Sequence, residues 1–262
     1  MLAGSRTARD RFAESQGHTR KALVPVAGVP MLVRVVHALA GAREVERIHV
    51  RGDDQAMRGL PGLQALVAAR RLTFGPCAAS PSGTVLQHLE ETPPAGPLLV
   101  VSGDHALLDI AMVEHFCAAA RCVAGDVVVA TVTARVVHAR YPDCGRTWIH
   151  LQDGAYKGGN LFALFSPRAA LAAAFLQRIE QFRKRPWRLV AALGLPTLTR
   201  FALRRLDLAG ALSAVSRACG VRIASVEMPF PECALDVDRV EDLALATRIL
   251  SSADAPLAPT VC

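Results

Sequence analysis

The stretch "GPLLVVSGD" (residues 96–104) decides the fold class of this 262-residue chain. Its apolar run is continuous rather than alternating, which is typical of a strand buried on both faces of a parallel sheet. A helical pattern follows at 109–122, and a second buried strand, "DVVVATVTA", begins at residue 126. This alternation predicts an α/β sheet with right-handed crossovers, in which ligands bind at the carboxyl ends of the strands.

The same alternation extends to both sides of this stretch. Upstream, the patterns predict a helix over 31–40 that stops at Gly41, strands at 47–50 and near 72–76, and a helix that Ser80-Pro81-Ser82-Gly83 opens. Downstream, they predict a strand–turn–strand over 146–166, a late strand at 221–229 and an amphipathic helix at 238–250. We therefore predict a single three-layer, Rossmann-like domain over 1–250, with a mixed, mainly parallel sheet, a helical insertion at about 167–217 and a disordered tail at 251–262.

The bulk properties narrow the class of protein. The formal charge is +7, with basic clusters "RKRPWR" (183–188) and "RFALRR" (200–205), which favours an anionic partner. No apolar run is long enough to span a bilayer, and the N-terminus lacks the features of a signal peptide, so we expect a cytoplasmic protein. The seven cysteines form no CxxC pair and are expected to be scattered reduced thiols.

Several common catalytic motifs are absent from the sequence. There is no GxxxxGK[ST], GxGxxG, HExxH or GxSxG pattern. Their absence takes many ATPases, dehydrogenases, metalloproteases and hydrolases out of first consideration.

Small and basic residues at the start of the chain suggest a phosphate site. Gly4 and Ser5 form a turn whose backbone N–H groups can approach phosphate oxygens, and Arg6, Arg9 and Lys21 can neutralise phosphate charge. An ordinary loop accounts for the same turn, because small residues are the usual turn formers.

Carboxylates in two places are candidate metal ligands. Asp104 ends the buried strand at 97–104, where it could bind Mg²⁺ or cap the next helix. Asp236 and Asp238 precede the last helix; one is expected to cap that helix, and the other could face the site. Glu241 and Asp242 lie in its first turn and are interpreted as structural, because negative charge there is favoured by the helix dipole.

Three segments together resemble the nucleotidyltransferases of the GT-A-like superfamily, which includes the sugar-1-phosphate, methylerythritol-phosphate and molybdenum-cofactor nucleotidyltransferases. They are "LAGSRTAR" with "KALVPVAGVPML", then "PLLVVSGDHALL", then "DVDRVEDLALA". The family pattern has LAGG-x-G-x-R, a lysine before Pro-x-x-Gly-x-Pro, a strand ending in Gly-Asp and an Asp/Asn segment before the last helix. The resemblance covers about three quarters of the chain and implies a GT-A-type sheet.

The resemblance also implies roles for individual residues. Lys21 and Arg9 would contact the phosphates of a nucleoside triphosphate, and Asp104 with Asp238 would bind Mg²⁺. The expected nucleotide-binding residues are Leu2, Ala3, Gly4, Ser5, Ser82, Gly83 and Thr84. The expected acceptor-binding residues are Gly145, Arg146, Gly159 and Asn160.

The chain departs from the family pattern in its first loop. Ser5 and Thr7 replace the second and third glycines, and the loop before Lys21 is long, so Arg6 or Arg20 could take the place of Arg9. The helical segment at 167–217 also lies outside the minimal pattern. It is interpreted as a subdomain that covers the sheet; a lid over the acceptor, or peripheral membrane contact through 183–205, is the alternative.

The expected reaction is transfer of a nucleoside monophosphate from a triphosphate to a phosphorylated small molecule or lipid headgroup, with Mg²⁺ and release of pyrophosphate. His105 is a candidate base, but an acceptor phosphate is already an anion and needs none. Two alternatives are a GT-A glycosyltransferase that uses a nucleotide-sugar and a non-catalytic nucleotide or nucleic-acid binder. The first would place Asp-x-Asp after a mid-sheet strand, where this chain has "SGDH", and the second would need aromatic side chains among the basic ones.

The position of the "LAGSR" turn raises one further expectation. In the family the turn follows a central strand, of which this chain has only Met1. We therefore expect either that translation starts upstream or that the chain has been shortened.

Overall fold

The computed structural model describes residues 1–4, 10–52, 55–92, 96–181 and 193–252 as a mixed α/β fold. Parallel pairs join β3 to β4 and β6 to β9, and β8 runs antiparallel between β5 and β6. The two groups of strands are linked by Leu2, which makes parallel bridges to Arg51 and Ser102. The mainly parallel central sheet that the sequence predicts is confirmed.

The strands and helices follow the predicted order along the chain. The strands are β1 (Pro25–Val26), β2 (Val29–Pro30), β3 (Ile48–Arg51), β4 (Leu72–Gly75), β5 (Leu98–Val101), β6 (Val127–Thr133), β7 (Ile149–Leu151), β8 (Gly154–Leu164) and β9 (Ile223–Glu227). The α-helices are α1 (Arg11–Ser15), α2 (Met31–Gly41), α3 (Gln55–Arg58), α4 (Gln64–Ala68), α5 (Pro81–Glu91), α6 (Ile110–Cys122), α7 (Ala134–Arg140), α8 (Ala169–Gln181), α10 (Leu195–Ala202), α11 (Leu208–Cys219) and α12 (Val240–Ser251). Short 3₁₀ helices are η1 (Lys21–Leu23), η2 (Pro61–Leu63) and η3 (Pro231–Ala234).

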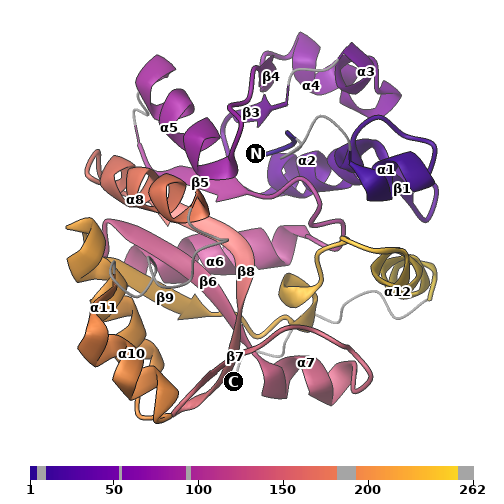
Figure 1. Cartoon of the computed structure of the whole chain (residues 1–262). Helices are drawn as coiled ribbons and strands as arrows, with labels where there is room; N and C mark the ends of the chain where they lie inside the picture. Colours follow the sequence, from indigo (N-terminus) through magenta and orange to yellow (C-terminus); the bar gives the residue numbers. More distant parts are fainter. Residues whose placement is uncertain (5–9, 53–54, 93–95, 182–192, 253–262) are drawn as a thin grey trace.

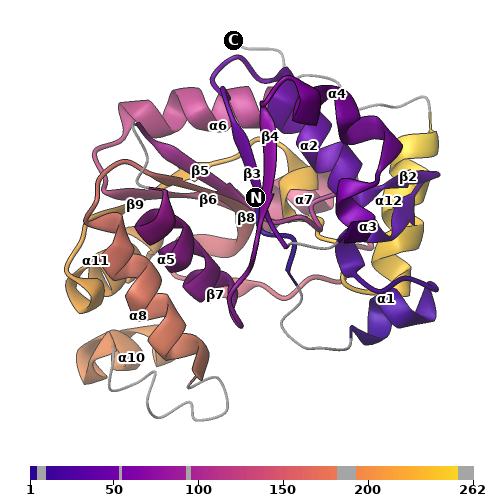
Figure 2. The same cartoon turned by 90° about the horizontal axis from the view of Figure 1, so that it is seen from above.

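The helices form layers on the two faces of the sheet. Figures 1 and 2 show α2 and α6 on one face and α5, α8 and α11 on the other. The apolar core of the first face includes Val35, Leu39 and Phe116, and that of the second includes Val100 and Phe175. The buried Val-rich strands predicted from their continuous apolar runs therefore contribute to both cores.

The first residues lie between β3 and β5. The Leu2 amide donates to the Val101 carbonyl at 2.8 Å, and the Gly103 amide donates to the Leu2 carbonyl at 2.7 Å. A Cβ atom on Gly103 would lie 2.9 Å from that carbonyl oxygen. The glycine of "SGD" is therefore required because the two backbones approach closely.

The structure decides one open alternative and corrects one predicted helix cap. Asp109, not Asp104, caps α6, and its carboxylate accepts the Met112 amide at 2.8 Å. The N-cap position of α12 is Arg239, so neither Asp236 nor Asp238 caps that helix. Asp104, Asp236 and Asp238, the candidate metal ligands, therefore cap neither α6 nor α12.

The segment at 167–217 contains α8, α10 and most of α11, and α8 packs against α5. The cluster at 183–188 and nearly all of the expected tail at 251–262 lie outside the described residues. In the part of the chain that the structure describes, no helix combines the length and apolar character needed to cross a bilayer. The six cysteines in that part are free thiols.

Candidate functional site

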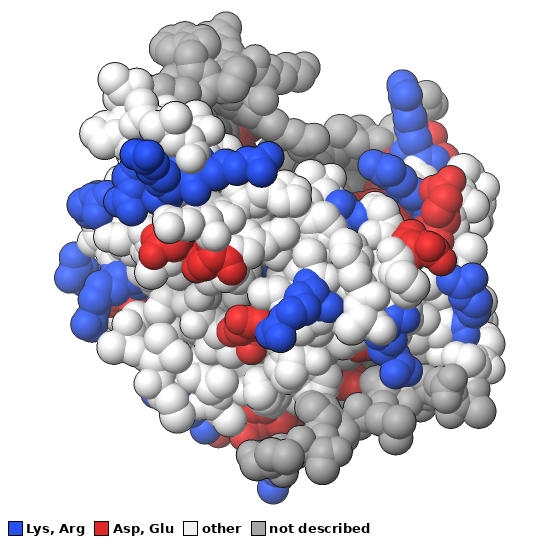
Figure 3. Space-filling model, turned by 90° about the horizontal axis from the view of Figure 1, so that it is seen from below, with Lys and Arg blue, Asp and Glu red and all other residues white. Residues whose placement is uncertain are grey.

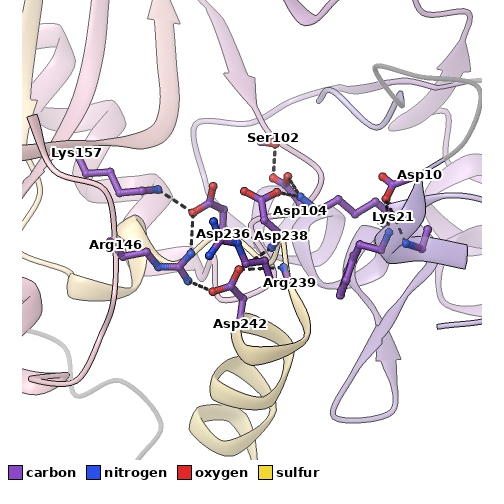
Figure 4. Close-up of polar contacts among 12 residues, drawn as sticks. Asp10, Lys21, Ser102, Asp104, Arg146, Lys157, Asp236, Asp238, Arg239 and Asp242 are labelled. Carbon is purple, nitrogen blue, oxygen red and sulfur yellow. Dashed lines mark hydrogen bonds and ion pairs between the residues drawn. The ribbon is translucent and has the colours of Figure 1, made fainter. Parts of the chain in front are cut away.

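Three side chains from distant parts of the chain converge at the carboxyl end of β5 (Figure 4). The Lys21 ammonium lies 2.5 Å from the Asp104 carboxylate and also contacts that of Asp238. Lys21 begins η1, Asp104 follows β5, and Asp238 precedes α12. The structure thus brings together the lysine and the two carboxylates that the sequence singles out.

Lys21 is held by the proline-rich corner that follows it. Residues 25–30 form a two-stranded hairpin whose turn places Ala27 and Gly28 at positive φ, 47° and 77°. Such a turn matches the twist of short antiparallel strands. Val24 and Val26 are fully buried, so the corner fixes the backbone from which the lysine extends.

Asp104 is oriented by its own loop. The Ser102 hydroxyl donates to one oxygen of the Asp104 carboxylate, and the Lys21 ammonium contacts the other. The Asp104 carbonyl accepts the Val237 amide at 3.2 Å. This backbone bond ties the loop after β5 to the segment that carries Asp238.

The charges at this point are strongly coupled. Burial of Lys21 lowers its pKa, but Asp104 and Asp238 outweigh this effect and hold the pKa of the ammonium above its ordinary value. Lys21 is therefore a permanent cation in the absence of ligands, and the two carboxylates already share one positive charge.

The two carboxylates fit a divalent cation. Asp104 and Asp238 converge on a single positive group, and carboxylate oxygens are the ligands that Mg²⁺ prefers. Within the described ranges, no group of three or more His, Cys, Asp and Glu side chains is placed to hold a metal. Two carboxylates suit a metal whose other ligands are water and substrate phosphates.

A small pocket lies beside the first residues, where a nucleotide is expected. Its lining includes Leu2, Gly4, Arg51, Ala79, Ser80 and Thr84. The Ser80 hydroxyl accepts the Gly83 amide and caps α5, and the Thr84 hydroxyl donates to the Ser80 carbonyl at 2.8 Å. Gly4 is also needed for space, because a Cβ atom there would lie 2.6 Å from the Cys77 sulfur. Ala3 is buried beside Leu2, and its amide donates to the Arg51 carbonyl.

Two of the expected nucleotide-binding residues face the neighbouring helix instead. The buried Ser82 hydroxyl donates to the Glu180 carboxylate at 2.7 Å. A Cβ atom on Gly83 would lie 2.7 Å from the Gln177 side-chain nitrogen. Both residues therefore pack α5 against α8, while Thr84 and Ser80 line the pocket.

Arg51 is a buried cation that the sequence did not single out. Its guanidinium contacts the Glu91 carboxylate at 2.6 Å and donates to the His88 ring. Burial, and then the charge of Arg51, lower the pKa of His88 to about 4. His88 is thus a neutral acceptor at physiological pH, and the network fixes Arg51 at the end of β3 and on the pocket wall.

A second cluster, which we call the Arg146 cluster, consists of Arg146, Lys157, Asp236 and Asp242 (Figure 4). One Asp236 oxygen lies 2.7 Å from the Lys157 ammonium and 3.6 Å from the Arg146 guanidinium. Arg146 also contacts Asp242 at 2.9 Å, and Asp242 accepts the Asp238 backbone amide at 3.0 Å. The cluster is therefore joined directly to the Lys21 site.

The Arg146 cluster is half-buried, and only 10% of the Arg146 side chain is exposed. Burial raises the pKa of Asp236, but Lys157 and then Arg146 outweigh it, so that the pKa lies below its ordinary value. Two cations thus share one carboxylate oxygen. Lys157 was missed from the sequence because its partner lies 79 residues away.

Asn160 occupies a strained position at a bulge in β8. Its φ is 57°, and its buried side-chain nitrogen has no hydrogen-bond partner among the described residues. The bulge opposes Val129–Thr131, and a Cβ atom on Gly159 would lie 2.9 Å from that of Ala130. Strain together with an unsatisfied donor is typical of a ligand-binding position.

The other predicted residues are placed as follows. Gly145 lies in the loop before Arg146, with nothing within 4 Å of a Cβ position. His105 is fully buried, with one ring nitrogen 3.3 Å from the Glu232 carbonyl, so it faces the protein interior rather than the Lys21 site. Ser5, Arg9 and the alternative Arg6 lie outside the described residues.

Comparisons with known proteins give similar solved structures and a matching family. A hypothetical transferase from Thermus thermophilus is 32% identical, with a TM-score of 0.76, over 92% of this chain and 96% of that chain. A 4-diphosphocytidyl-2C-methyl-D-erythritol synthase from Anaerococcus prevotii is 12% identical, with a TM-score of 0.53, over 95% of this chain and 93% of that one.

A CMP:2-keto-3-deoxy-manno-octonic acid synthetase in complex with CTP is 15% identical, with a TM-score of 0.52, over 88% of this chain and 92% of that one. The comparison with curated proteins gave no match. The family model of the MobA-like NTP transferase domain matches residues 1–192. The chain therefore belongs to the family of MobA-like NTP transferases.

Proposed function

We propose that this transferase moves a nucleoside monophosphate from a nucleoside triphosphate to a phosphorylated acceptor and releases pyrophosphate. One observation carries the proposal: Lys21, Asp104 and Asp238, from three distant segments, meet at the carboxyl end of β5. A lysine beside two convergent carboxylates is suited to a triphosphate with its divalent ion.

In the proposed reaction, an oxygen of the acceptor phosphate attacks the α-phosphorus. A new P–O bond forms, the bond between the α-phosphorus and the bridging oxygen breaks, and that oxygen leaves with pyrophosphate. Lys21 stabilises the negative charge that develops on the α-phosphate oxygens. The Lys21 ammonium contacts two carboxylate oxygens. A phosphate oxygen is also an anionic acceptor, so it can take their place as the partner of Lys21.

Asp104 and Asp238 would hold Mg²⁺. When bound, this ion would neutralise part of the negative charge of the triphosphate. Ser102 keeps one Asp104 oxygen in a fixed orientation. No side chain need accept a proton, because the attacking phosphate is an anion. The buried position of His105 supports this interpretation.

The basic side chains of the Arg146 cluster support a phosphorylated acceptor. Arg146 and Lys157 both contact one oxygen of Asp236, so a single incoming phosphate can bind both cations in competition with Asp236 and Asp242. Asp242 links Arg146 to the backbone of Asp238, and this link would keep the acceptor phosphate next to the metal carboxylates. Asn160, with its unsatisfied amide nitrogen, would donate to the acceptor.

The proposal is tested by a screen for pyrophosphate release. Each of ATP, CTP, GTP and UTP is incubated with Mg²⁺ and a panel of phosphorylated sugars, polyols, lipid headgroups and molybdopterin. Pyrophosphate from one pair, lost in Asp104→Ala, is the expected result. Turnover of a nucleotide-sugar, with no pyrophosphate from any pair, would favour a GT-A glycosyltransferase instead.

A further inference from the structure

Residues 195–205, which we call the α10 surface, combine exposed apolar and basic side chains. Helix α10 has no buried residue. Leu195 is 68% exposed, Leu203 65% and Phe201 44%. Large apolar side chains gathered in one short segment and open to water are typical of a contact surface rather than of an ordinary surface helix.

The same surface is positively charged. Arg200, Arg204 and Arg205 are exposed, and the sequence has no Asp or Glu from 195 to 206. Two acids adjoin this surface at the start of α11: Asp153 accepts the Leu208 amide at 3.1 Å, and Asp207 caps that helix. Figure 3 views the molecule from below, the side on which α10 lies in Figure 1; basic side chains gather at its upper left, next to uncharged side chains and a few acidic ones.

The α10 surface is held in a defined shape. The Arg205 amide donates to the Arg200 carbonyl at 2.7 Å, and the Arg200 guanidinium donates back to the Arg205 carbonyl at 3.3 Å. Leu206, the next residue, is buried, and its carbonyl accepts the Gln152 amide. The apolar and basic side chains are therefore presented together by a closed turn.

We propose that the α10 surface docks on an anionic lipid bilayer. A short helix with exposed leucine and phenylalanine side chains flanked by arginines has the chemistry of an element that lies in the bilayer interface. Apolar side chains would enter the headgroup region, and the arginines would contact anionic headgroups.

Two other partners fit the surface less well. In a symmetric dimer both copies would contribute this same basic patch, which has no Asp or Glu between 195 and 206 to pair with the arginines of the other copy. A nucleic-acid site would offer several aromatic side chains for base stacking, and the α10 surface has Phe201 alone. An anionic lipid surface matches both the apolar and the basic side chains.

Sedimentation with lipid vesicles tests the proposal. The full chain is mixed with vesicles of phosphatidylcholine alone or with 30% phosphatidylglycerol. We expect it to sediment with the anionic vesicles only. Leu195→Ser with Leu203→Ser should lower the partition coefficient at least tenfold. Arg204→Gln with Arg205→Gln should lower it about 25-fold, since each charge contributes about fivefold.

Val67→Ser is the matched control, because Val67 is 42% exposed on α4, outside this surface. It should bind like the wild type, and far-ultraviolet circular dichroism should be the same for all variants. Equal binding to neutral vesicles, or no binding to either kind, would overturn the proposal. It would also be overturned by concentration-dependent dimerisation, or RNA binding, that the same variants abolish while vesicles remain unbound.

Discussion

Replacing Lys21 with methionine should lower catalytic activity and, at the same time, tighten the binding of Mg²⁺ in the absence of nucleotide. The ammonium lies 2.5 Å from Asp104 and also contacts Asp238. If it stabilises charge on the α-phosphate, Lys21→Met should lower kcat/KM for pyrophosphate release by about 10²–10³, the loss typical of one removed donor to a developing oxyanion.

The same substitution should tighten the binding of Mg²⁺ without nucleotide. Lys21 and the metal compete for the same two carboxylates, so removal of the ammonium frees both. The ion pair with Asp104 is half-buried and that with Asp238 is more exposed, so we discount it to about 1 kcal/mol. The expected gain in Mg²⁺ affinity is therefore about fivefold.

Isothermal titration of the wild type and of Lys21→Met with Mg²⁺ measures this change. Lys157→Met is the control, because Lys157 pairs with Asp236 and not with the metal carboxylates; its Mg²⁺ affinity should stay within twofold of the wild type. Lys21→Arg keeps the charge and should show no gain. Unchanged or weaker Mg²⁺ binding in Lys21→Met, or full activity in that variant, would refute the reasoning.

Three further predictions concern the acceptor, the fold and pH. Arg146→Gln and Lys157→Gln should each raise KM for the acceptor at least tenfold while KM for the triphosphate changes little; steady-state kinetics with each substrate varied in turn measures both KM values. A rise in the KM for the triphosphate instead would contradict this prediction. Gly103→Ala should lower the free energy of unfolding by about 2 kcal/mol and Tm by about 4–8 °C, because its Cβ would lie 2.9 Å from a backbone oxygen, whereas Gly158→Ala, in open space, should unfold like the wild type. Burial and then the charge of Arg51 lower the pKa of His88 from 6.5 to about 4, so between pH 6.5 and 4 the unfolded state binds more protons than the folded state. The free energy of unfolding should therefore fall as the pH drops from 6.5 to 4. Urea unfolding of His88→Asn should show a smaller fall over this range, and a pH profile identical to that of the wild type would show that His88 does not contribute.

The sequence was sufficient for the frame of the fold because its strands are continuous apolar runs and its loops carry glycine and proline. Those features place Asp104 at the carboxyl end of a buried strand, where ligands bind, and the resemblance to the nucleotidyltransferases added Lys21 to the same site. The residue pattern alone left Asp236 and Asp238 as alternatives before the last helix, and the resemblance selected Asp238. The segment "SGD" was interpretable as a site, but the close backbone approach that requires Gly103 depends on the pairing of β5 with the first residues.

The rest depended on contacts between distant segments. Arg51 gave no signal because its partners, His88 and Glu91, lie on α5, and Lys157 gave none because Asp236 comes from the far end of the chain. The predicted cap of the last helix was wrong because carboxylates before a helix favour caps in general, whereas here Asp242 receives the backbone amides before α12.

Pyrophosphate release tests the central claim most directly. The wild-type chain is assayed with each of the four nucleoside triphosphates, Mg²⁺ and the panel of phosphorylated acceptors, and the nucleotide product is identified by mass spectrometry. We predict that one pair yields pyrophosphate and a diphosphate-linked product in equal amounts, and that Lys21→Ala and Asp104→Ala abolish both. No pyrophosphate from any pair, or full activity in either variant, would contradict the proposed chemistry of this site.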